Sequence, residues 1–119
     1  MSFPGDLDDV ILEVVGAVPA GALATYGDVA GLVSELGHPC GPRRVARSLS
    51  MFGGSVPWWR VVHSAGTLAE PVAGRARELL AAEGIHTDGR RVPLAAHRWH
   101  PDEAALRALA ETVGPRRGR

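Results

Sequence analysis

The stretch Val56-Pro57-Trp58-Trp59-Arg60-Val61-Val62 decides how the middle of the chain folds. Pro57 fixes its own φ angle and has no amide hydrogen to donate, so it favours a rigid corner over a continuing helix. Trp58 and Trp59 are neighbours, and in an extended segment adjacent side chains point to opposite sides. We therefore expect one indole to anchor in the core while the other faces a cleft. Two core tryptophans are an equally acceptable interpretation, because large aromatic side chains are usually buried.

Length and composition predict a single domain. The chain has 119 residues, and its hydrophobic share of 45% is enough for one ordinary core. We expect this domain to span residues 1–113 and a basic tail to occupy residues 114–119. Cys40 is the one cysteine, which excludes an internal disulfide and fits a reducing compartment. With no signal peptide and no apolar run of membrane-spanning length, we expect a soluble cytoplasmic protein without membrane contact.

The charges are unevenly distributed, although the formal net charge is zero. Residues 1–35 carry six acids and no base, whereas residues 36–69 carry four arginines and no acid. A neutral chain with a basic middle can still present a stripe of positive charge to phosphates. We therefore expect any nucleic acid to meet the middle of the chain and to avoid the acidic first helix.

Apolar residues recur at helical spacing in several segments, which predicts a fold that is mainly α with short strands. In the second helix, Thr25 and Asp28 are spaced as a capping box, and Gly37 ends the helix. Short extended pieces are expected at residues 61–63 and 67–68. Asp88-Gly89 suits a small hairpin within residues 85–92. The predicted helices cover residues 7–18, 25–36, 42–51, 72–83 and 101–113.

The second and third predicted helices are separated by a turn that contains glycine, as in a helix-turn-helix. Arg43 and Arg47 are four residues apart and share an exposed face, with Arg44 beside them. Arginines near the start of the second helix of such a pair suit contact with DNA. A helical hairpin with solvated charges is the alternative, because motif-like pairs of helices are common.

The sequence offers little for catalysis or metal binding. His38 with Cys40, and His97 with His100, do not make a four-ligand set at zinc spacing, and no phosphate-binding loop appears, so we expect no metal and no cofactor. Cys40 has no obvious base beside it, which favours a structural cysteine. A hydrolase built on Ser64 and the preceding histidine is disfavoured, because adjacent residues in a strand point apart.

Several short pieces occur in a fixed order, and together they make residues 18–84 resemble the DNA-binding, C-terminal domain of the O6-alkylguanine-DNA alkyltransferases. The resemblance implies a winged-helix-like helix-turn-helix domain. The pieces are Pro19-Ala20-Gly21, Thr25-Tyr26-Gly27-Asp28-Val29-Ala30, Arg43-Arg44-Val45-Ala46, Pro57-Trp58-Trp59-Arg60-Val61-Val62, Ser64-Ala65-Gly66 and Glu78-Leu79-Leu80-Ala81-Ala82-Glu83-Gly84.

The active-site motif of that family is Pro-Cys-His-Arg-Val, and here Trp58 stands at the cysteine position and Trp59 at the histidine position. A tryptophan in place of the cysteine marks the alkyltransferase-like proteins. These are described as binding alkylated guanine without repairing it and as handing the lesion to nucleotide excision repair. Most of them keep the histidine, so Trp59 is a departure. Because an indole offers no nucleophilic lone pair, the resemblance implies a binding protein without a catalytic residue.

The resemblance also implies roles for single residues. Arg43 matches the arginine finger that fills the gap left by a flipped nucleotide, and Tyr26 matches the tyrosine that pushes the target phosphate. Trp58 would form a wall of the pocket that receives the base, and residues 67–71 would lie near the opposite wall. Glu83 matches a glutamate that supports the family's histidine, and with Trp59 in that place we expect Glu83 to be a helix-end residue only. The further expected DNA contacts are Arg44, Arg47 and Arg60, and the further expected pocket residues are Trp59, Val61, Ser64, Thr67 and Leu68.

The favoured hypothesis is a monomeric protein that binds O6-alkylguanine in double-stranded DNA by nucleotide flipping and signals to nucleotide excision repair proteins. Its recognition helix would lie in the minor groove, which makes the search for lesions largely independent of sequence. One alternative is a helix-turn-helix regulatory module that binds DNA without preferring lesions. Another is a residual enzyme that acts through Cys40.

Overall fold

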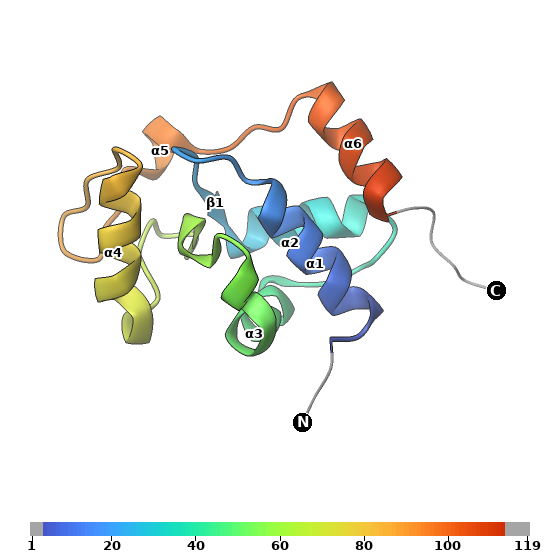
Figure 1. Ribbon diagram of the computed structural model, residues 1–119, viewed down its shortest axis with the longest axis horizontal. Helices are drawn as coiled ribbons and strands as arrows, with labels where there is room; N and C mark the ends of the chain where they lie inside the picture. The colour runs from blue at the N-terminus through green and yellow to red at the C-terminus, as the bar shows by residue number, and fades with distance from the viewer. Residues whose placement is uncertain (1–3, 114–119) are drawn as a thin grey trace.

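The computed structural model describes residues 4–113, which form a mainly helical fold with one two-stranded sheet (Figure 1). The predicted fold class is therefore confirmed. The helices are α1 (Asp6–Ala17), α2 (Tyr26–Glu35), α3 (Pro42–Phe52), α4 (Ala73–Ala82), α5 (Leu94–His97) and α6 (Glu103–Val113). The strands are β1 (Ala24–Thr25) and β2 (Val61–Val62), and short 3-10 turns are η1 (Gly53–Ser55), η2 (Trp58–Arg60) and η3 (Glu70–Val72).

The helix boundaries follow the capping residues in the sequence. At the start of α2, the Asp28 amide donates to Thr25 Oγ1 at 2.9 Å, and the Thr25 amide donates to Asp28 Oδ2 at 3.1 Å, so the predicted capping box is present. Pro42 occupies the first turn of α3, where its missing amide hydrogen costs nothing. Helix α6 begins at Glu103 and not at Pro101, because Asp102 accepts the Ala105 amide at 2.8 Å as an N-cap residue does.

The sheet differs from the prediction. Strand β2 pairs in parallel with β1, with Ala24 opposite Val61 and Thr25 opposite Val62. The extended piece predicted at residues 67–68 is present as an isolated bridge, because Thr67 pairs antiparallel with Arg91 and the Leu68 amide donates to the Arg90 carbonyl at 2.7 Å. A strand of two residues has no periodicity of its own, so β1 gave no signal in the sequence.

The chain after α4 returns to the start of the fold. Asp88 and Arg91 exchange two backbone hydrogen bonds of 2.9 Å around Gly89, whose φ of +63° suits a tight turn, so the small predicted hairpin is present. Beyond the short helix α5, the Leu23 amide donates to the His97 carbonyl at 2.8 Å, and the Trp99 amide donates to the Leu23 carbonyl at 2.7 Å. These bonds hold the segment that leads to α6 alongside β1.

Two hydrophobic clusters meet at the sheet. The first lies among α1, α2 and α3, with Leu109 of α6 added. The second lies under α4. Adjacent strand residues point to opposite sides, so Val61 belongs to the first cluster and Val62 to the second. The short sheet therefore joins the two halves of the domain, and the tryptophan turn η2 precedes it directly.

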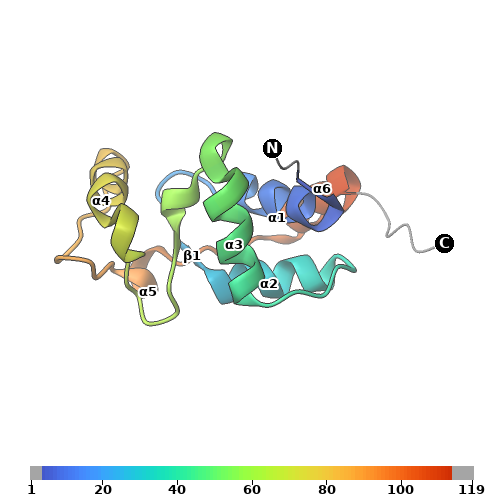
Figure 2. The ribbon, with the colours of Figure 1, turned by 90° about the horizontal axis from the view of Figure 1, so that it is seen from below.

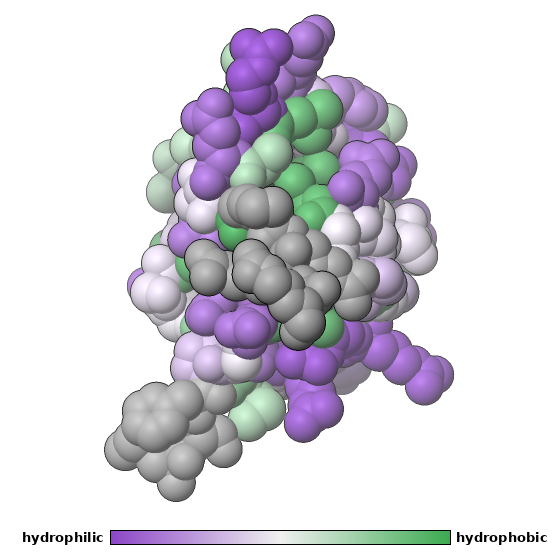
Figure 3. Space-filling view, turned by 90° about the vertical axis from the view of Figure 1, so that its right-hand side faces the viewer, coloured by the Kyte–Doolittle hydropathy of each residue, from purple (hydrophilic) through white to green (hydrophobic). Residues whose placement is uncertain are grey.

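Figure 2 shows α4 at one end of the molecule and α3 near its middle, with the chain that follows α3 passing between them. Helix α6 packs beside α1 at the opposite end from α4. The surface at that end is mostly hydrophilic, with a group of apolar side chains in its upper half (Figure 3). Within residues 4–113, no helix combines the length and the apolar character needed to cross a bilayer.

Candidate nucleic-acid interface

The exposed face of α3 carries two free arginines. Arg43, Ala46, Arg47 and Ser50 are spaced by three or four residues and therefore follow one stripe along the helix. The opposite face turns inward through Val45, which is fully buried. Arg43 and Arg47 are exposed, and within the described part of the chain neither has a hydrogen-bond or ion-pair partner. Both guanidinium groups are thus available to phosphates or bases, as the sequence predicted for this face.

Arg44 does not share that face. Its Nη2 donates to Asp8 Oδ1 at 3.0 Å, so it ties α3 to the first turn of α1. Ser48, fully buried on α3, donates its hydroxyl to the same carboxylate oxygen. The Ser48 hydroxyl, and to a lesser degree the Arg44 guanidinium, hold the pKa of Asp8 below its ordinary value. The prediction that Arg44 contacts DNA is not supported, because its guanidinium is already used inside the fold.

A pocket of about 450 Å³ lies between α3, the tryptophan turn and η3. The α3 stripe supplies one wall, Trp58 supplies a second, and η3 supplies a third. Tyr26 and His63 complete it, with their ring centroids 5.2 Å apart. Burial raises the pKa of Tyr26, so its hydroxyl stays protonated and can donate. The lining residues are Tyr26, Ala46, Leu49, Ser50, Gly53, Gly54, Trp58, His63, Ala69, Pro71 and Val72.

The two indoles of the tryptophan turn have different surroundings, as the sequence predicted, but the backbone that carries them is not the extended segment that was expected. The turn is a 3-10 segment and not a strand, and the Trp58 and Trp59 rings meet edge to face at 5.8 Å and 88°. Both indoles pack on the cluster under α4, and Trp58 also lines the pocket, which Trp59 does not. Gly53 allows this approach to α3, because a Cβ there would lie 3.2 Å from Leu49 Cδ2 and 3.7 Å from Trp58 Cβ.

The remaining pocket predictions need correction. Val61 and Leu68 are buried in the two clusters and do not reach the pocket. Ser64 is exposed in the turn after β2, and Thr67 pairs with Arg91 on the hairpin side. None of Ser64, Thr67 and Trp59 lines the pocket. The opposite wall, expected within residues 67–71, is supplied by Ala69 and Pro71 of that range together with Val72.

Arg60 also lies away from the DNA-binding face. Its Nη2 donates to Glu83 Oε2 at 2.7 Å and its Nη1 donates to the Val18 carbonyl at 2.8 Å. The Arg60 and Glu83 side chains are only 15% and 11% exposed. The predicted DNA contact of Arg60 is therefore not supported. The expectation that Glu83 is only a helix-end residue is wrong, because its carboxylate is the centre of a hydrogen-bond network.

Cys40 does not belong to the pocket. It lies in the turn before α3, where its amide donates to Ser34 Oγ at 3.2 Å. Burial raises the pKa of its thiol, which disfavours the thiolate needed for alkyl transfer. Among residues 4–113, no group of three histidine, cysteine, aspartate or glutamate side chains is placed to hold a metal ion.

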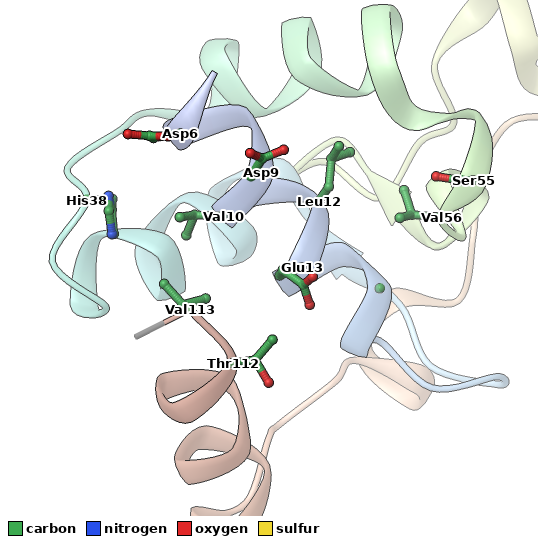
Figure 4. Close-up of a pocket in the computed structure, with 11 residues that line it drawn as sticks. Asp6, Asp9, Val10, Leu12, Glu13, His38, Ser55, Val56, Thr112 and Val113 are labelled. Atoms are coloured by element: carbon green, nitrogen blue, oxygen red, sulfur yellow. The ribbon is translucent and has the colours of Figure 1, made fainter. Parts of the chain in front are cut away.

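A larger groove of about 760 Å³ lies on the other side of α1. Figure 4 shows Asp6, Asp9 and Glu13 of α1 beside it, with His38 and Val113 across the groove. Its charged side chains are acidic and would repel phosphate, so this groove does not suit nucleic acid. The smaller pocket between α3, the tryptophan turn and η3 lies next to the α3 arginines and does suit nucleic acid.

Comparison with known proteins is consistent with a nucleic-acid interface at this pocket. Residues 6–85 match the family model described as "6-O-methylguanine DNA methyltransferase, DNA binding domain". A DNA base-flipping protein of Escherichia coli K12 is 38% identical over 95 residues, which cover 76% of this chain and 71% of that protein. A DNA base-flipping protein of Vibrio parahaemolyticus is 31% identical over 96 residues, covering 76% of this chain and 93% of that protein.

Solved structures resemble this fold as well. Atl1 of S. pombe, in a complex with damaged DNA containing O6-carboxymethylguanine, superposes with a TM-score of 0.70 at 25% identity. A second structure, of S. pombe ATL in complex with DNA, superposes with a TM-score of 0.65 at 26% identity. Each alignment covers 84% of this chain and 100% of the other. The similarity therefore extends beyond the sequence motifs to the arrangement of the helices.

Proposed function

Since the chain belongs to the family of the 6-O-methylguanine DNA methyltransferase DNA-binding domain, we propose that it binds O6-alkylguanine in duplex DNA and receives the flipped base in the pocket beside Trp58. One observation carries this proposal. A pocket large enough for a nucleobase and a substituent opens directly beside the free arginine stripe of α3. The relatives named for base flipping, and the S. pombe complex with a damaged duplex, support the same assignment.

The pocket and the arginine stripe of α3 have different roles in binding. Arg47 neutralises a phosphate and contributes affinity for any duplex. Arg43, nearer the start of α3, enters the stack and fills the space that the flipped nucleotide leaves. Tyr26, whose ring lies at the pocket beside His63, pushes the phosphate of the target nucleotide. Flipping costs a few kcal/mol, and less for a poorly paired base, while contact with the Trp58 indole offsets part of that cost.

The protein does not transfer the alkyl group in this proposal. Alkyl transfer to the protein needs a thiolate and a base that activates it. Trp58 stands where the resemblance places the cysteine, and the Cys40 thiol lies outside the pocket. A protein that binds the lesion and leaves it in place must hand it on. We therefore propose nucleotide excision repair proteins as its partners. The proposal also includes a monomer as the binding unit and a cytoplasmic location.

Paired binding titrations test this proposal. Two duplexes of identical sequence, one with O6-methylguanine and one with guanine, are titrated at the same salt concentration, because phosphate contacts make affinity salt-dependent. The proposal predicts tighter binding of the lesion duplex and no mass change of the protein after incubation. Equal affinities would support a helix-turn-helix module without lesion preference. An added methyl group on Cys40 would support a residual enzyme.

A further inference from the structure

Trp59 is held in place by Glu83, the residue that follows α4. The indole Nε1 donates to Glu83 Oε2 at 2.8 Å. The other carboxylate oxygen, Oε1, accepts the Gly21 amide at 2.9 Å, so the same side chain is tied to the loop before β1. Burial alone would raise the pKa of Glu83, but the Arg60 guanidinium, the Gly21 amide and the Trp59 indole lower it below its ordinary value. The carboxylate is thus ionised at neutral pH, and hydrogen bonds to an ionised acceptor are the strong ones.

Arg60 restrains the same indole from a second direction. Its Cζ lies 5.3 Å from the Trp59 ring centroid, within the range of a cation–π contact. Its Nε lies 3.0 Å from both oxygens of Glu83, so the guanidinium bridges ring and carboxylate. The Trp59 ring is therefore fixed at its N–H by Glu83 and over its face by Arg60. Neither restraint involves a residue that lines the pocket.

The fixed ring in turn contacts Trp58. The two ring planes meet at 88° with centroids 5.8 Å apart, the preferred edge-to-face geometry of an aromatic pair. We propose that Trp59 is a positioning residue, which sets the orientation of the Trp58 indole in the pocket wall through its own anchorage to Glu83. This inference rests on the proposed function, and it makes discrimination between lesion and plain DNA depend on a ring outside the pocket.

The identity of the anchor matters. The donor to Glu83 is an indole N–H and not the imidazole of the Pro-Cys-His-Arg-Val motif. An indole N–H is a donor only, whereas imidazole gains charge near neutral pH. The pocket wall of this protein is thus fixed without a group that titrates between pH 5 and 8 at position 59.

Three substitutions and a control separate positioning from stability. Trp59→Phe keeps an aromatic ring and removes the N–H. Trp59→His keeps a donor, and Glu83→Gln keeps an acceptor without its charge. Trp99→Phe makes the same change at a half-buried tryptophan in the other cluster, and so measures the general cost of losing an indole. Each variant is titrated with the O6-methylguanine and plain duplexes, and the edge-to-face indole pair is followed by its exciton couplet in circular dichroism.

The inference predicts that Trp59→Phe lowers the ratio of lesion to plain affinity by about threefold to tenfold, the effect of one aromatic or hydrogen-bond contact. Plain-duplex affinity stays within about twofold, and Trp59→His restores most of the ratio. Glu83→Gln weakens the couplet although both indoles remain. Trp99→Phe leaves the ratio unchanged.

Several results would contradict the role proposed for Trp59. A normal ratio in Trp59→Phe, or an unchanged couplet and ratio in Glu83→Gln, would overturn the inference while leaving the proposed function intact. So would an equal fall of the ratio in Trp59→Phe and Trp99→Phe. A wild-type ratio of one would instead remove the proposed function itself.

Discussion

The guanidinium of Arg44 lies 3.0 Å from Asp8 Oδ1, and this ion pair fastens the helix that carries the DNA-facing arginines to the first turn of α1. Ser48 donates to the same carboxylate, and the Asp8 side chain is only 12% exposed. The Asp8 side chain also accepts the Gly5 amide at 2.9 Å, as the cap of its own helix. One buried carboxylate therefore sets both the start of α1 and the position of α3.

Replacement of Asp8 by alanine should destabilise the fold by about 3 kcal/mol, because it leaves the Ser48 hydroxyl and the Arg44 guanidinium without their acceptor. Urea unfolding followed by circular dichroism measures the loss. Glu78→Ala is the matched control, since it breaks an exposed pair with Arg75 and should cost less than about 0.5 kcal/mol. Equal losses in the two variants would show that the buried carboxylate has no special role.

The two free arginines of α3 should differ in what they contribute to binding. Arg47→Ala should weaken lesion and plain duplexes alike and reduce the slope of log affinity against log salt by about one. Arg43→Ala should weaken the lesion duplex much more than the plain duplex, because filling the gap in the stack matters only when a base is flipped. Titrations at several salt concentrations measure both effects. If both substitutions change lesion preference equally, Arg43 is not the inserted residue.

Arg60→Ala should lower the free energy of unfolding and leave the phosphate contacts with DNA unchanged. Its partner Glu83 would remain buried without its cation, a change worth about 3 kcal/mol of unfolding free energy. The salt slope of DNA binding should stay at the wild-type value, since the guanidinium faces Glu83 and the Val18 carbonyl. A slope reduced by about one, as for Arg47, would return Arg60 to the DNA interface.

Stability should decline in acid because of three carboxylates. The pKa values of Asp8, Asp28 and Glu83 are all lowered in the fold, from an ordinary value of 3.8 for the two aspartates and 4.5 for the glutamate. Between the folded and the ordinary pKa the unfolded chain binds more protons, so the free energy of unfolding rises with pH in this range. The contribution is complete above about pH 5 and is lost as pH falls through 4.5 and 3.8 towards the folded values.

Urea unfolding at several pH values between about 3 and 6 checks this dependence. Glu83→Gln removes one of these three titrating groups and should flatten the pH dependence relative to wild type. A stability that is constant across this range, or a slope unaltered by Glu83→Gln, would contradict the assignment of Glu83 as an ionised hydrogen-bond acceptor.

Local signals in the sequence predicted local structure well. The capping box of Thr25 and Asp28, and Pro42 at the start of α3, act within a few residues and fix helix starts whatever surrounds them. The separation of Trp58 from Trp59 followed from their being adjacent beside a proline. The exposed Arg43 and Arg47 followed from helical spacing, and the same spacing extended by one turn would have identified Ala46 and Ser50 as pocket residues.

Long-range contacts could not be predicted in the same way. The exposure of an arginine depends on which acid meets it, and Asp8 lies 36 residues from Arg44 while Glu83 lies 23 from Arg60. Helical spacing separates Arg44 from the face of Arg43, but no local signal identifies the acidic partner of either arginine. Likewise, β1 exists because β2 and the segment after α5 both bond to it. His63 was not predicted as a pocket residue, because the pairing of β1 with β2 is what brings it beside Tyr26.

The account depends on a flipped base resting against Trp58, and the affinity ratio of lesion to plain duplex in wild type and in Trp58→Ala tests this most directly. Both proteins are titrated at one salt concentration with the O6-methylguanine duplex and its unmodified twin. We predict a wild-type ratio well above one that falls at least severalfold in Trp58→Ala, while plain-duplex affinity is retained through the α3 arginines. A ratio that is the same in both proteins would contradict the account, because the base would then not be held by this indole.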